Sequence, residues 1–497
     1  MDTDSYIFTI TEIEEIPPRL KRTFRSGKTL PLEYRRQQLI QFGRMIQENR
    51  SAIEEALNTD MGKPRFEAGT SELVPTFTSI VTALNNIEEW AAPEKRKVEE
   101  WRSNWETMVY PVPKGCALII APWNYPFVLA FNPLAGAIAA GCPAIIKPSE
   151  HAPATAALSA RLVGKYLDPD AYIVVNGGVA EATVLLNHRW DHIFYTGNPT
   201  VGRIIAEVAA RHLTSVTLEL GGKSPVVVAE DCDLEITARR ILCGKVQNCG
   251  QLCISPDHVY VPRSIIPAFI EALKRAYAKF YPENVFNTSM AWGRMIHPAH
   301  HNTVIHQLEK TMGTVVLGGE VEGETRIAPT IVSEVAMDDA LMEAEIFGPI
   351  LPILPVDDVD EAIKRIADGP SPLVLYAFTN DEALQKRRAP VHLSGSIVIN
   401  DTYIQLLVYE LPFGGFGESG NGQYLGKSSF DAFTHRRSLL HVPTSYVFAP
   451  RVFFEDPLPS SSRRLDSTPL FQARYPPYTQ QGYDKFTAVL DTKLPEA

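Results

Sequence analysis

The segment "GQLCISP", residues 250–256, places one cysteine, Cys253, between a flexible glycine and a proline turn. A cysteine thiolate is a nucleophile or a metal ligand, whereas a buried thiol behaves as a small apolar side chain. A nucleophile would need a base and a group that stabilises an oxyanion. A metal site would lack the paired C-x-x-C spacing of zinc sites. It would use Cys243, Cys249, Cys253 and His258. The heptapeptide alone does not choose among these three interpretations.

Two polar residues at the ends of predicted apolar strands are candidates for the partners of a nucleophile. Glu219 lies in "LELGG" and Asn124 lies in "PWNYP", each beside a glycine or proline turn. Ligand sites in open α/β sheets lie at the carboxyl ends of the strands, so the two side chains are consistent with one shared cleft. Taken separately, either residue is equally well explained as a structural residue that pairs with the backbone of its turn.

The segment "FYTGNPTVG" has the form of a phosphate-binding turn. A strand is expected to end at Thr196 and a helix to begin near Pro199, which leaves backbone N–H groups at the helix start free for a phosphate. Gly197 and Gly202 do not complete the G-x-G-x-x-G fingerprint. A turn that binds nothing is therefore an equally good interpretation.

The segment "IIKPSE" places Lys147 and Glu150 just beyond the end of another buried strand. A lysine there can donate to a ribose hydroxyl or contact a phosphate, and a carboxylate can accept from a ribose hydroxyl. A solvated charge pair at a helix start explains the two residues equally well.

Alternating patterns predict the elements that must position these residues. Short, β-branched strands are expected in "CALIIAPW", "PAIIKP", "YIVVNGG", "DHIFYTG" and "SVTLELGG", with helices over 153–166, 180–188 and 200–212 between them. Helices are also expected over 31–92, with one ending at Gly62. Such strand–helix alternation with apolar strands predicts an α/β fold with a parallel sheet covered on both faces.

A second α/β unit is expected from Pro225 onward. Its predicted strands are "PVVVAE", "HVYVP", "APTIVSEV" and "PILPILPV", with helices over 233–247 and 266–279. The charged and aromatic segment 95–113 predicts a projecting hairpin. Residues 456–480 are rich in proline and serine and predict an extended arm, followed by a short helix with Tyr483, Phe486 and Leu490 on one face.

Composition argues against several classes of protein. A net charge of −11 provides no basic surface for nucleic acid, and six cysteines in 497 residues are too few for a disulfide scaffold. The first twenty residues lack the pattern of a signal peptide, and the last seven lack a lipidation motif.

The uncharged stretch Tyr125–Ile146 has the length of a membrane span, but three prolines favour a buried helix followed by a buried strand. We expect a chain without a membrane span, located in the cytoplasm. A membrane anchor outside the sequence would change that location.

Seven motifs occur in the order found in aldehyde dehydrogenases. They are "PWNYPF", "IIKPSE", "YTGNPTVG", "LELGGKSP", "NCGQLC", "EIFGPILP" and "LPFGGFGESGNG". The chain resembles this family from about residue 20 to residue 445. It is most similar to the class 3 branch, which includes the fatty aldehyde dehydrogenases, in "DHIFYTGN", "AYIVVNGG" and "GKSSFDAFTHRRS".

The resemblance implies catalytic roles for the three candidate residues. Cys253 is the expected nucleophile, the Asn124 amide and the Cys253 N–H the expected oxyanion donors, and Glu219 the base that activates water. The implied product is a carboxylic acid, formed through a thiohemiacetal and a thioester. Transfer of the acyl group to coenzyme A is an alternative that the presence of Glu219 disfavours, and a silent structural relative is a second alternative.

The resemblance also implies NAD as cofactor, with NADP as an alternative, and no metal. Lys147 and Glu150 would hold the adenosine ribose, Glu345 the nicotinamide ribose, and Phe347 would pack near the nicotinamide. The diphosphate would lie on the turn formed by Gly197, Asn198, Pro199, Thr200, Val201 and Gly202.

The implied fold has a Rossmann-like cofactor domain (1–94 and 114–220), an α/β catalytic domain (221–423), a β oligomerisation element (95–113 and 424–446) and a C-terminal arm (447–497). By the same resemblance we expect a homodimer, with peripheral membrane contact as an alternative mode of association.

Three departures from the family pattern bear on the substrate and the cofactor. Leu252 stands beside the nucleophile where many relatives have threonine, and Pro199 is unusual in the phosphate turn. The segment "DTYIQLLVYE", 401–410, differs from relatives and is expected to line the aldehyde entrance. These residues favour a long or bulky apolar aldehyde.

Overall fold

The computed structural model describes residues 8–100, 103–287, 292–386, 394–443 and 480. They fall into two compact units, one within residues 1–90 and 113–434 and the other within residues 91–112 and 435–497. The predicted C-terminal helix lies outside the described residues, as does the predicted arm apart from Gln480.

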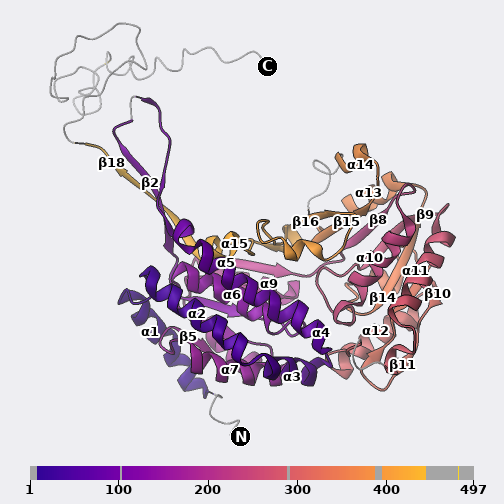
Figure 1. The fold of residues 1–497 in the computed structure, drawn as a ribbon, viewed down its shortest axis with the longest axis horizontal. Coiled ribbons are helices and arrows are strands. Elements are labelled where there is room, and N and C mark those ends of the chain that lie inside the picture. Colours follow the sequence, from indigo (N-terminus) through magenta and orange to yellow (C-terminus); the bar gives the residue numbers. More distant parts are fainter. Residues whose placement is uncertain (1–7, 101–102, 288–291, 387–393, 444–479, 481–497) are drawn as a thin grey trace. The chain divides into compact units, whose positions relative to one another are not determined.

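The first sheet of the larger unit has the strand order β17-β7-β6-β3-β4-β5. Its edge strand β5 is labelled in Figure 1. The five strands from β7 to β5 are parallel, which confirms the predicted parallel sheet, and β17 is antiparallel to β7. β17 has only two residues, so no periodic pattern in the sequence predicts this strand. The strands are β3 (Ala117–Ile120), β4 (Ala144–Lys147), β5 (Tyr172–Val174), β6 (His192–Gly197), β7 (Ser215–Leu220) and β17 (Gly420–Asn421).

Helices cover this sheet because successive strand side chains point to opposite faces. Leu118 and Ile145 contribute to a core that also contains Ile13 of α1 (Ile10–Arg25), Leu185 of α8 (Val179–Asn187) and Ile205 of α9 (Pro199–Ala210). α6 (Val128–Ala140) packs on β3 and β4. α2 (Leu32–Glu48) and α7 (Pro153–Tyr166) pack on each other. The remaining N-terminal helices follow the prediction for residues 31–92. They are α2 (Leu32–Glu48), α3 (Arg50–Met61), α4 (Arg65–Ala68), a π-helical segment (Gly69–Leu73) and α5 (Val74–Ala91), with α7 at Pro153–Tyr166.

The uncharged stretch 125–146 forms α6 and then β4, as predicted. Gly141 ends the helix with φ 87°, a left-handed conformation that glycine adopts without steric cost. Likewise Gly62 ends α3 with φ 62°. No helix in the described part of the chain is both long and apolar enough to cross a membrane.

The second sheet of the larger unit has the order β10-β13-β14-β9-β8-β15-β16. All neighbours are parallel except β10 and β13. Its strands are β8 (Pro225–Val228), β9 (His258–Pro262), β10 (Thr314–Leu317), β13 (Thr330–Ser333), β14 (Ile350–Val356), β15 (Val374–Phe378) and β16 (Ser396–Ile399), with a short pair β11 (Val321–Glu322) and β12 (Arg326–Ile327). The helices are α10 (Leu234–Val246), α11 (Ile266–Phe280), α12 (Pro298–Lys310), α13 (Val359–Ala367) and α14 (Glu382–Lys386). α15 (Lys427–Ala432) packs on α6, which covers the first sheet.

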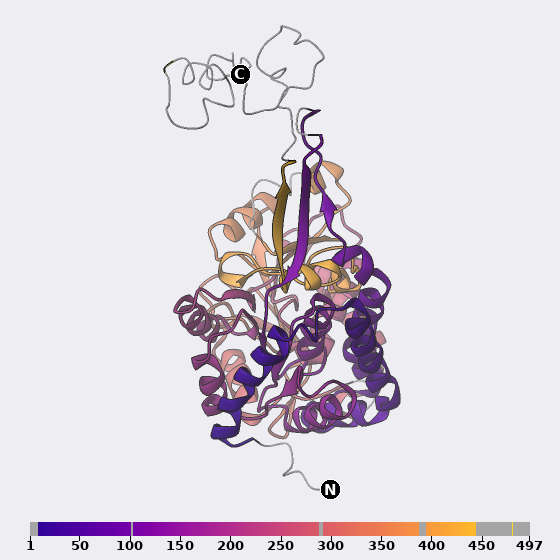
Figure 2. The same ribbon diagram turned by 90° about the vertical axis from the view of Figure 1, so that its left-hand side faces the viewer.

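The smaller unit is built on a three-stranded sheet of order β1-β2-β18. β1 (Glu94–Lys95) and β2 (Glu106–Pro113) form an antiparallel hairpin, which confirms the prediction for residues 95–113. The third strand, β18 (Thr434–His441), runs beside β2 (Figure 2) and lies within residues 424–446, which the family resemblance had assigned to the same β element. From residue 435 onward its side chains are exposed.

Candidate active site

Cys253 lies in a sharply turned segment between a 3-10 turn (Gln247–Gly250) and β9. Asn248 and Cys249 both have left-handed backbone conformations, with φ 49° and 54°. Gly250 also has positive φ, and a Cβ there would lie 2.1 Å from the carbonyl oxygen of Gly348. Such strain in non-glycine residues persists only where the surroundings impose it, and it concentrates at functional sites.

The Cys253 thiol lies in a half-buried position where ionisation is opposed. Burial raises the pKa of this thiol far above its ordinary value, and the carboxyl groups of Glu345 and Glu219 raise it further. The backbone N–H groups of Cys253 and Ile254 act in the opposite direction. A reactive thiolate therefore needs a change in its surroundings, such as a bound cation or the removal of a neighbouring negative charge.

Glu219 is the last residue but one of the strand β7. In the sheet it lies opposite Thr196 of β6 and Gly420 of β17. Its side chain is 4% exposed, and neither carboxyl oxygen has a hydrogen-bond partner among the described residues. Burial raises its pKa well above the ordinary value. Burying a carboxyl group without partners costs stability, so its presence calls for a functional explanation.

Asn124 is held in place against the nucleophile segment. Its amide nitrogen donates to the carbonyl oxygen of Gln251 at 3.1 Å, two residues before Cys253. The backbone carbonyl oxygen of Asn124 accepts from the side-chain amide of Asn248 at 2.8 Å and from Lys63 Nζ at 3.3 Å. The loop after β3 and the cysteine segment thus form one hydrogen-bonded assembly, which meets the expectation that Asn124 lies near Cys253.

A buried ion pair that the sequence did not single out supports this assembly. Lys63 Nζ lies 2.6 Å from Glu72 Oε1, and both side chains are fully buried. The second oxygen of Glu72 accepts from the backbone N–H groups of Phe127 and Val128 at 3.1 and 2.8 Å. Glu72 therefore fixes the start of α6 immediately after the Asn124 loop. Only a contact across about sixty residues reveals this function, so a single-sequence pattern could not find it.

The predicted adenosine-ribose residues lie together at the end of β4. Lys147 is the last residue of the strand rather than the first beyond it, and its Nζ lies 3.1 Å from Glu150 Oε2. Burial alone would raise the pKa of Glu150, but its own backbone N–H and Lys147 hold that pKa below the ordinary value, so Glu150 carries a charge. A Cβ added to the neighbouring Gly178 would have only Glu150 within 4 Å, at 3.9 Å, so there is open space beside the pair.

The predicted diphosphate turn forms the start of α9. Asn198 caps the helix by accepting from the N–H of Val201 at 2.9 Å, and Pro199 occupies the first helical position. Thr200 follows in that first turn. Gly202 is buried, and a Cβ there would lie 2.8 Å from Leu220 of β7, so the helix packs closely on the strand that bears Glu219. Gly197 ends β6. This first turn and the Lys147–Glu150 pair fit a dinucleotide at the carboxyl edge of the sheet.

Glu345 and Phe347 lie on the loop before β14. Burial and Asp257 raise the pKa of Glu345 to about 8, against the opposing effect of the Gly222 N–H. A Cβ on Gly221 would lie 2.2 Å from Glu345 Oε2, so this carboxyl group contacts the turn after Glu219. Phe347 has φ 49°, and its carbonyl oxygen accepts from His300 Nε2 at 2.8 Å. The structure thus brings Glu345, Glu219 and Cys253 into electrostatic contact.

A largely apolar cavity opens beside the nucleophile. Its lining includes Cys253 and Leu252 together with Tyr403, Leu406, Leu407 and Tyr409 of the 401–410 segment. Leu252 and part of this segment thus line the same cavity as Cys253, and the assignment of the segment to the aldehyde entrance stays a prediction. Sequence reasoning missed the rest of the wall, which comes from residues up to 350 positions apart. It consists of Ser71, Pro75, Tyr125, Val128, Leu129, Asn132, Phe413, Tyr424 and Leu425.

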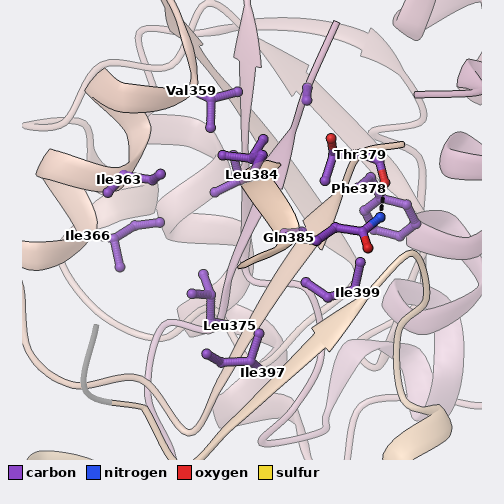
Figure 3. A pocket seen from close by; sticks show the side chains of 13 residues that line it. Val359, Ile363, Ile366, Leu375, Phe378, Thr379, Leu384, Gln385, Ile397 and Ile399 are labelled. Carbon is purple, nitrogen blue, oxygen red and sulfur yellow. Dashed lines mark hydrogen bonds between the residues drawn. The ribbon is translucent and has the colours of Figure 1, made fainter. Parts of the chain in front are cut away.

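A second apolar cavity lies away from these residues, between α13, α14 and the seven-stranded sheet (Figure 3). Its wall is aliphatic apart from Phe378, Thr379 and Gln385, and Gln385 donates to the Thr379 carbonyl at 3.1 Å. It holds no titratable side chain, so it offers no acid–base or nucleophilic chemistry. No group of His, Cys, Asp and Glu side chains in the described ranges is arranged to hold a metal ion.

The fold and the site define an α/β enzyme with a cysteine beside a carboxyl group at the edge of a parallel sheet. The aldehyde dehydrogenase family model matches residues 9–439. Aldehyde dehydrogenase family 3 member A2 from Pongo abelii is 45% identical over 85% of this chain and 87% of its own length. The dimeric NADP-preferring aldehyde dehydrogenase of Canis lupus familiaris is 42% identical over 87% of this chain and 95% of its own. A solved structure of Staphylococcus aureus AldH in a substrate-bound state has a TM-score of 0.85, with 39% identity over 87% of this chain and 94% of that one.

The chain belongs to the aldehyde dehydrogenase family, and its relatives place it in the class 3 branch. It is an NAD(P)-dependent enzyme that oxidises aldehydes to carboxylic acids. The resemblance inferred from the seven motifs is confirmed.

Proposed function

We propose that this enzyme acts on long-chain or bulky apolar aldehydes, with Cys253 as the nucleophile. The observation that carries the proposal is the cavity whose wall combines Cys253 with aliphatic and aromatic side chains. An apolar chain in such a wall gains roughly 0.8 kcal/mol for each buried methylene.

The proposed substrate class is tested with a series from propanal to decanal. We expect kcat/KM to rise by up to about fourfold per added methylene until the cavity is filled. Equal kcat/KM values for propanal and decanal would contradict the proposal. Adding coenzyme A to the decanal assay tests the acylating alternative, because only that activity yields an acyl-coenzyme A product.

The proposed chemistry begins when the Cys253 thiolate attacks the carbonyl carbon and forms a C–S bond. The Asn124 amide and the Cys253 N–H donate to the resulting oxyanion. A nicotinamide cofactor held by Glu345 and Phe347 would supply the acceptor for the hydride and its electron pair, and loss of that hydride from the carbon would leave a thioester on Cys253. Glu219 then takes a proton from water, the hydroxide adds to the thioester, and the C–S bond breaks to release the acid and the thiolate.

We infer that the cofactor lies along the carboxyl edge of the six-stranded sheet. Lys147 and Glu150 would hold the adenosine ribose, the turn from Gly197 to Gly202 the diphosphate, and Glu345 with Phe347 the nicotinamide riboside. The charge on Glu150 would repel a 2′-phosphate, which favours NAD, although the canine relative is named NADP-preferring. Measuring kcat/KM with each cofactor decides the preference.

We also propose that residues 1–94 and 114–220 form the cofactor domain and residues 221–423 the catalytic domain. The segments 95–113 and 424–446 would form the oligomerisation element of a homodimer. Support comes from the two distinct parallel sheets, from the separate three-stranded sheet, and from the canine relative, which is named dimeric.

A cytoplasmic location with peripheral membrane contact is the proposed setting. All six cysteines lie in the described residues and are free, as in a reducing compartment. Leu407 lines the cavity and is also 53% exposed, next to the exposed Ile404, Val408 and Leu411. An apolar rim at a cavity mouth suits contact with lipid. Flotation with lipid vesicles tests this contact, and a Leu407→Glu variant that floats as well as the wild type would contradict it.

A further inference from the structure

Asn132 and Tyr125 line the cavity beside Cys253. Asn132 Oδ1 and the Tyr125 hydroxyl have no hydrogen-bond partner among the described residues. Asn132 is 5% exposed and Tyr125 is 3% exposed, so bulk water does not compensate for the missing bonds. Buried polar groups are normally paired, and an unpaired one in a ligand cavity marks the place where a ligand supplies the partner.

Local structure does not account for these two atoms. Asn132 lies within α6, on the same side as Val128 and Leu129, which also line the cavity. An asparagine inside a helix bonds to the preceding turn through its Nδ2–H₂ group, which donates to a backbone carbonyl, so the helix itself offers no partner for Oδ1. Each neighbour of Asn132 along the helix is apolar, so a leucine would pack equally well at this position if packing were its only function.

The environment of Tyr125 narrows the chemistry of the missing partner. Lys63 Nζ lies 3.9 Å from the centre of the Tyr125 ring, but this ammonium is already paired with Glu72. The pKa of the Tyr125 hydroxyl is raised well above its ordinary value by burial and also by Tyr403, Glu67 and Glu72, so the phenol stays protonated. These neighbours disfavour a second negative charge, which excludes a substrate carboxylate at this point.

We propose that Asn132 and Tyr125 form a polar subsite that recognises a hydroxyl group on the chain of the aldehyde substrate. A hydroxyl donates to Asn132 Oδ1 and accepts from the Tyr125 phenol, whereas an ether oxygen can only accept and a methyl group does neither. The inference rests on the proposed function of the cavity, and it adds a specificity for hydroxyaldehydes to the preference for apolar chains.

The test compares ω-hydroxyalkanals of six to ten carbons with two matched sets of aldehydes. In one set a methyl group replaces the hydroxyl, and in the other the hydroxyl is methylated. In the wild type we expect the ratio of kcat/KM for hydroxyl over methyl to peak at one or two chain lengths, because the subsite is fixed in the wall. The methoxy compounds should show no such peak.

Two variants attribute the peak to the subsite. Asn132→Leu should lower the hydroxyl-to-methyl ratio at the peak by about threefold to tenfold, the effect of one hydrogen bond, and should raise kcat/KM for the alkanal. Tyr125→Phe keeps the ring against Lys63 and should lower the ratio by a similar factor. Leu129→Met changes the same wall without touching a polar group and should leave the ratio as it is.

The outcomes distinguish a failure of the proposed hydroxyl subsite from a failure of the proposed function on which it rests. A ratio that does not vary with chain length, or that Asn132→Leu leaves unchanged, overturns the subsite while alkanal oxidation still supports the proposed function. A well-folded enzyme that oxidises neither series overturns the proposed function itself. If a variant fails to fold, the chain-length profile of the wild type with hydroxyl, methyl and methoxy compounds still decides.

Discussion

In the proposed mechanism Cys253 and Glu219 must both lose a proton, and burial opposes that loss in each. The thiol has Glu345 and Glu219 as neighbours, and the Glu219 carboxyl group has no partner among the described residues. Because two like charges close together in a poorly solvated site are unfavourable, the two groups should not ionise together in the free enzyme. Proton positions at these residues therefore govern the order of the steps.

The first prediction concerns the reactivity of the Cys253 thiol without cofactor. Since its pKa is raised, the rate of alkylation by iodoacetamide should increase about tenfold per pH unit from pH 7 to 9 without a plateau. Glu345→Gln should accelerate alkylation at pH 9, where the wild-type carboxylate with its pKa of about 8 is charged, and much less at pH 7. Peptide mass spectrometry locates the modified cysteine, and a plateau below pH 8 would show that the thiol ionises readily.

The second prediction separates hydride transfer from hydrolysis. Glu219→Gln removes the proposed base but keeps a side chain of similar shape, so one equivalent of reduced cofactor should form per site before turnover stalls. Steady-state turnover should fall about a hundredfold to ten-thousandfold. Rapid-mixing absorbance detects the burst, and intact-mass analysis detects the thioester. A variant that binds cofactor but shows neither would mean that Glu219 acts before the thioester forms.

The same substitution has a consequence for stability. The pKa of Glu219 is raised in the folded state, so this residue favours folding below its unfolded pKa near 4.5, and that contribution is lost as the pH rises toward the folded pKa. Glu219→Gln has no charge to bury. We therefore expect the variant to gain stability relative to the wild type between pH 5 and pH 8 in urea titrations, and a constant difference would contradict the raised pKa.

At the scale of elements, the start of α6 depends on a charge buried in another helix. Glu72 receives the N–H groups of Phe127 and Val128 and is neutralised by Lys63. α6 in turn carries Asn132, and the loop before it carries Asn124. One ion pair thus positions both the proposed oxyanion donor and the proposed hydroxyl subsite.

Removing one member of that pair should be costly. Lys63→Met leaves the Glu72 carboxylate buried without its cation and should lower the free energy of unfolding by about 3–5 kcal/mol. Adding Glu72→Gln should restore much of the loss, because no charge then remains buried. The matched control is Lys28→Met. The Lys28 side chain is 42% exposed beside Asp168, so its loss should lower the free energy of unfolding by less than about 1 kcal/mol. Equal losses in the two single variants would show that burial of the pair is unimportant.

At the scale of the whole molecule, the three-stranded sheet of the smaller unit has an exposed edge. From residue 435 onward β18 is exposed, and Leu439 and Leu440 are 38% and 58% accessible. An exposed edge strand with apolar side chains is a site for pairing with another chain. This observation supports the proposed homodimer independently of the canine relative.

We expect the wild type to have twice the chain mass of 55.2 kDa in light scattering. Leu439→Glu combined with Leu440→Glu should shift it to the monomer mass, since charges at an apolar edge oppose pairing. Met312→Glu, at a residue of the larger unit that is 91% exposed, should leave the dimer intact. A wild-type monomer at micromolar concentration would contradict the proposal.

Much of the fold follows from the sequence alone, because strand and helix periodicities are local. Apolar runs such as "AIIK" and "HIFYTG" predicted the parallel strands, and Gly62 predicted the end of α3. The ordered motifs around Cys253, Glu219 and Asn124 identified the family and the candidate residues. β17 was not predicted because a strand of two residues carries no buried pattern. The exposed β18 has no buried pattern either, and only the family resemblance placed a β element at residues 424–446.

The tertiary structure decided what surrounds each candidate residue. No local pattern relates Lys63 to Asn124, or Asn132 to Tyr403, since these contacts join segments far apart in the chain. Nor does the sequence distinguish a paired asparagine from an unpaired one, because pairing depends on three-dimensional neighbours. Residue type and spacing determined the chemistry available to this enzyme, whereas long-range packing decided which ionisable groups are buried and which polar atoms have no hydrogen-bond partner.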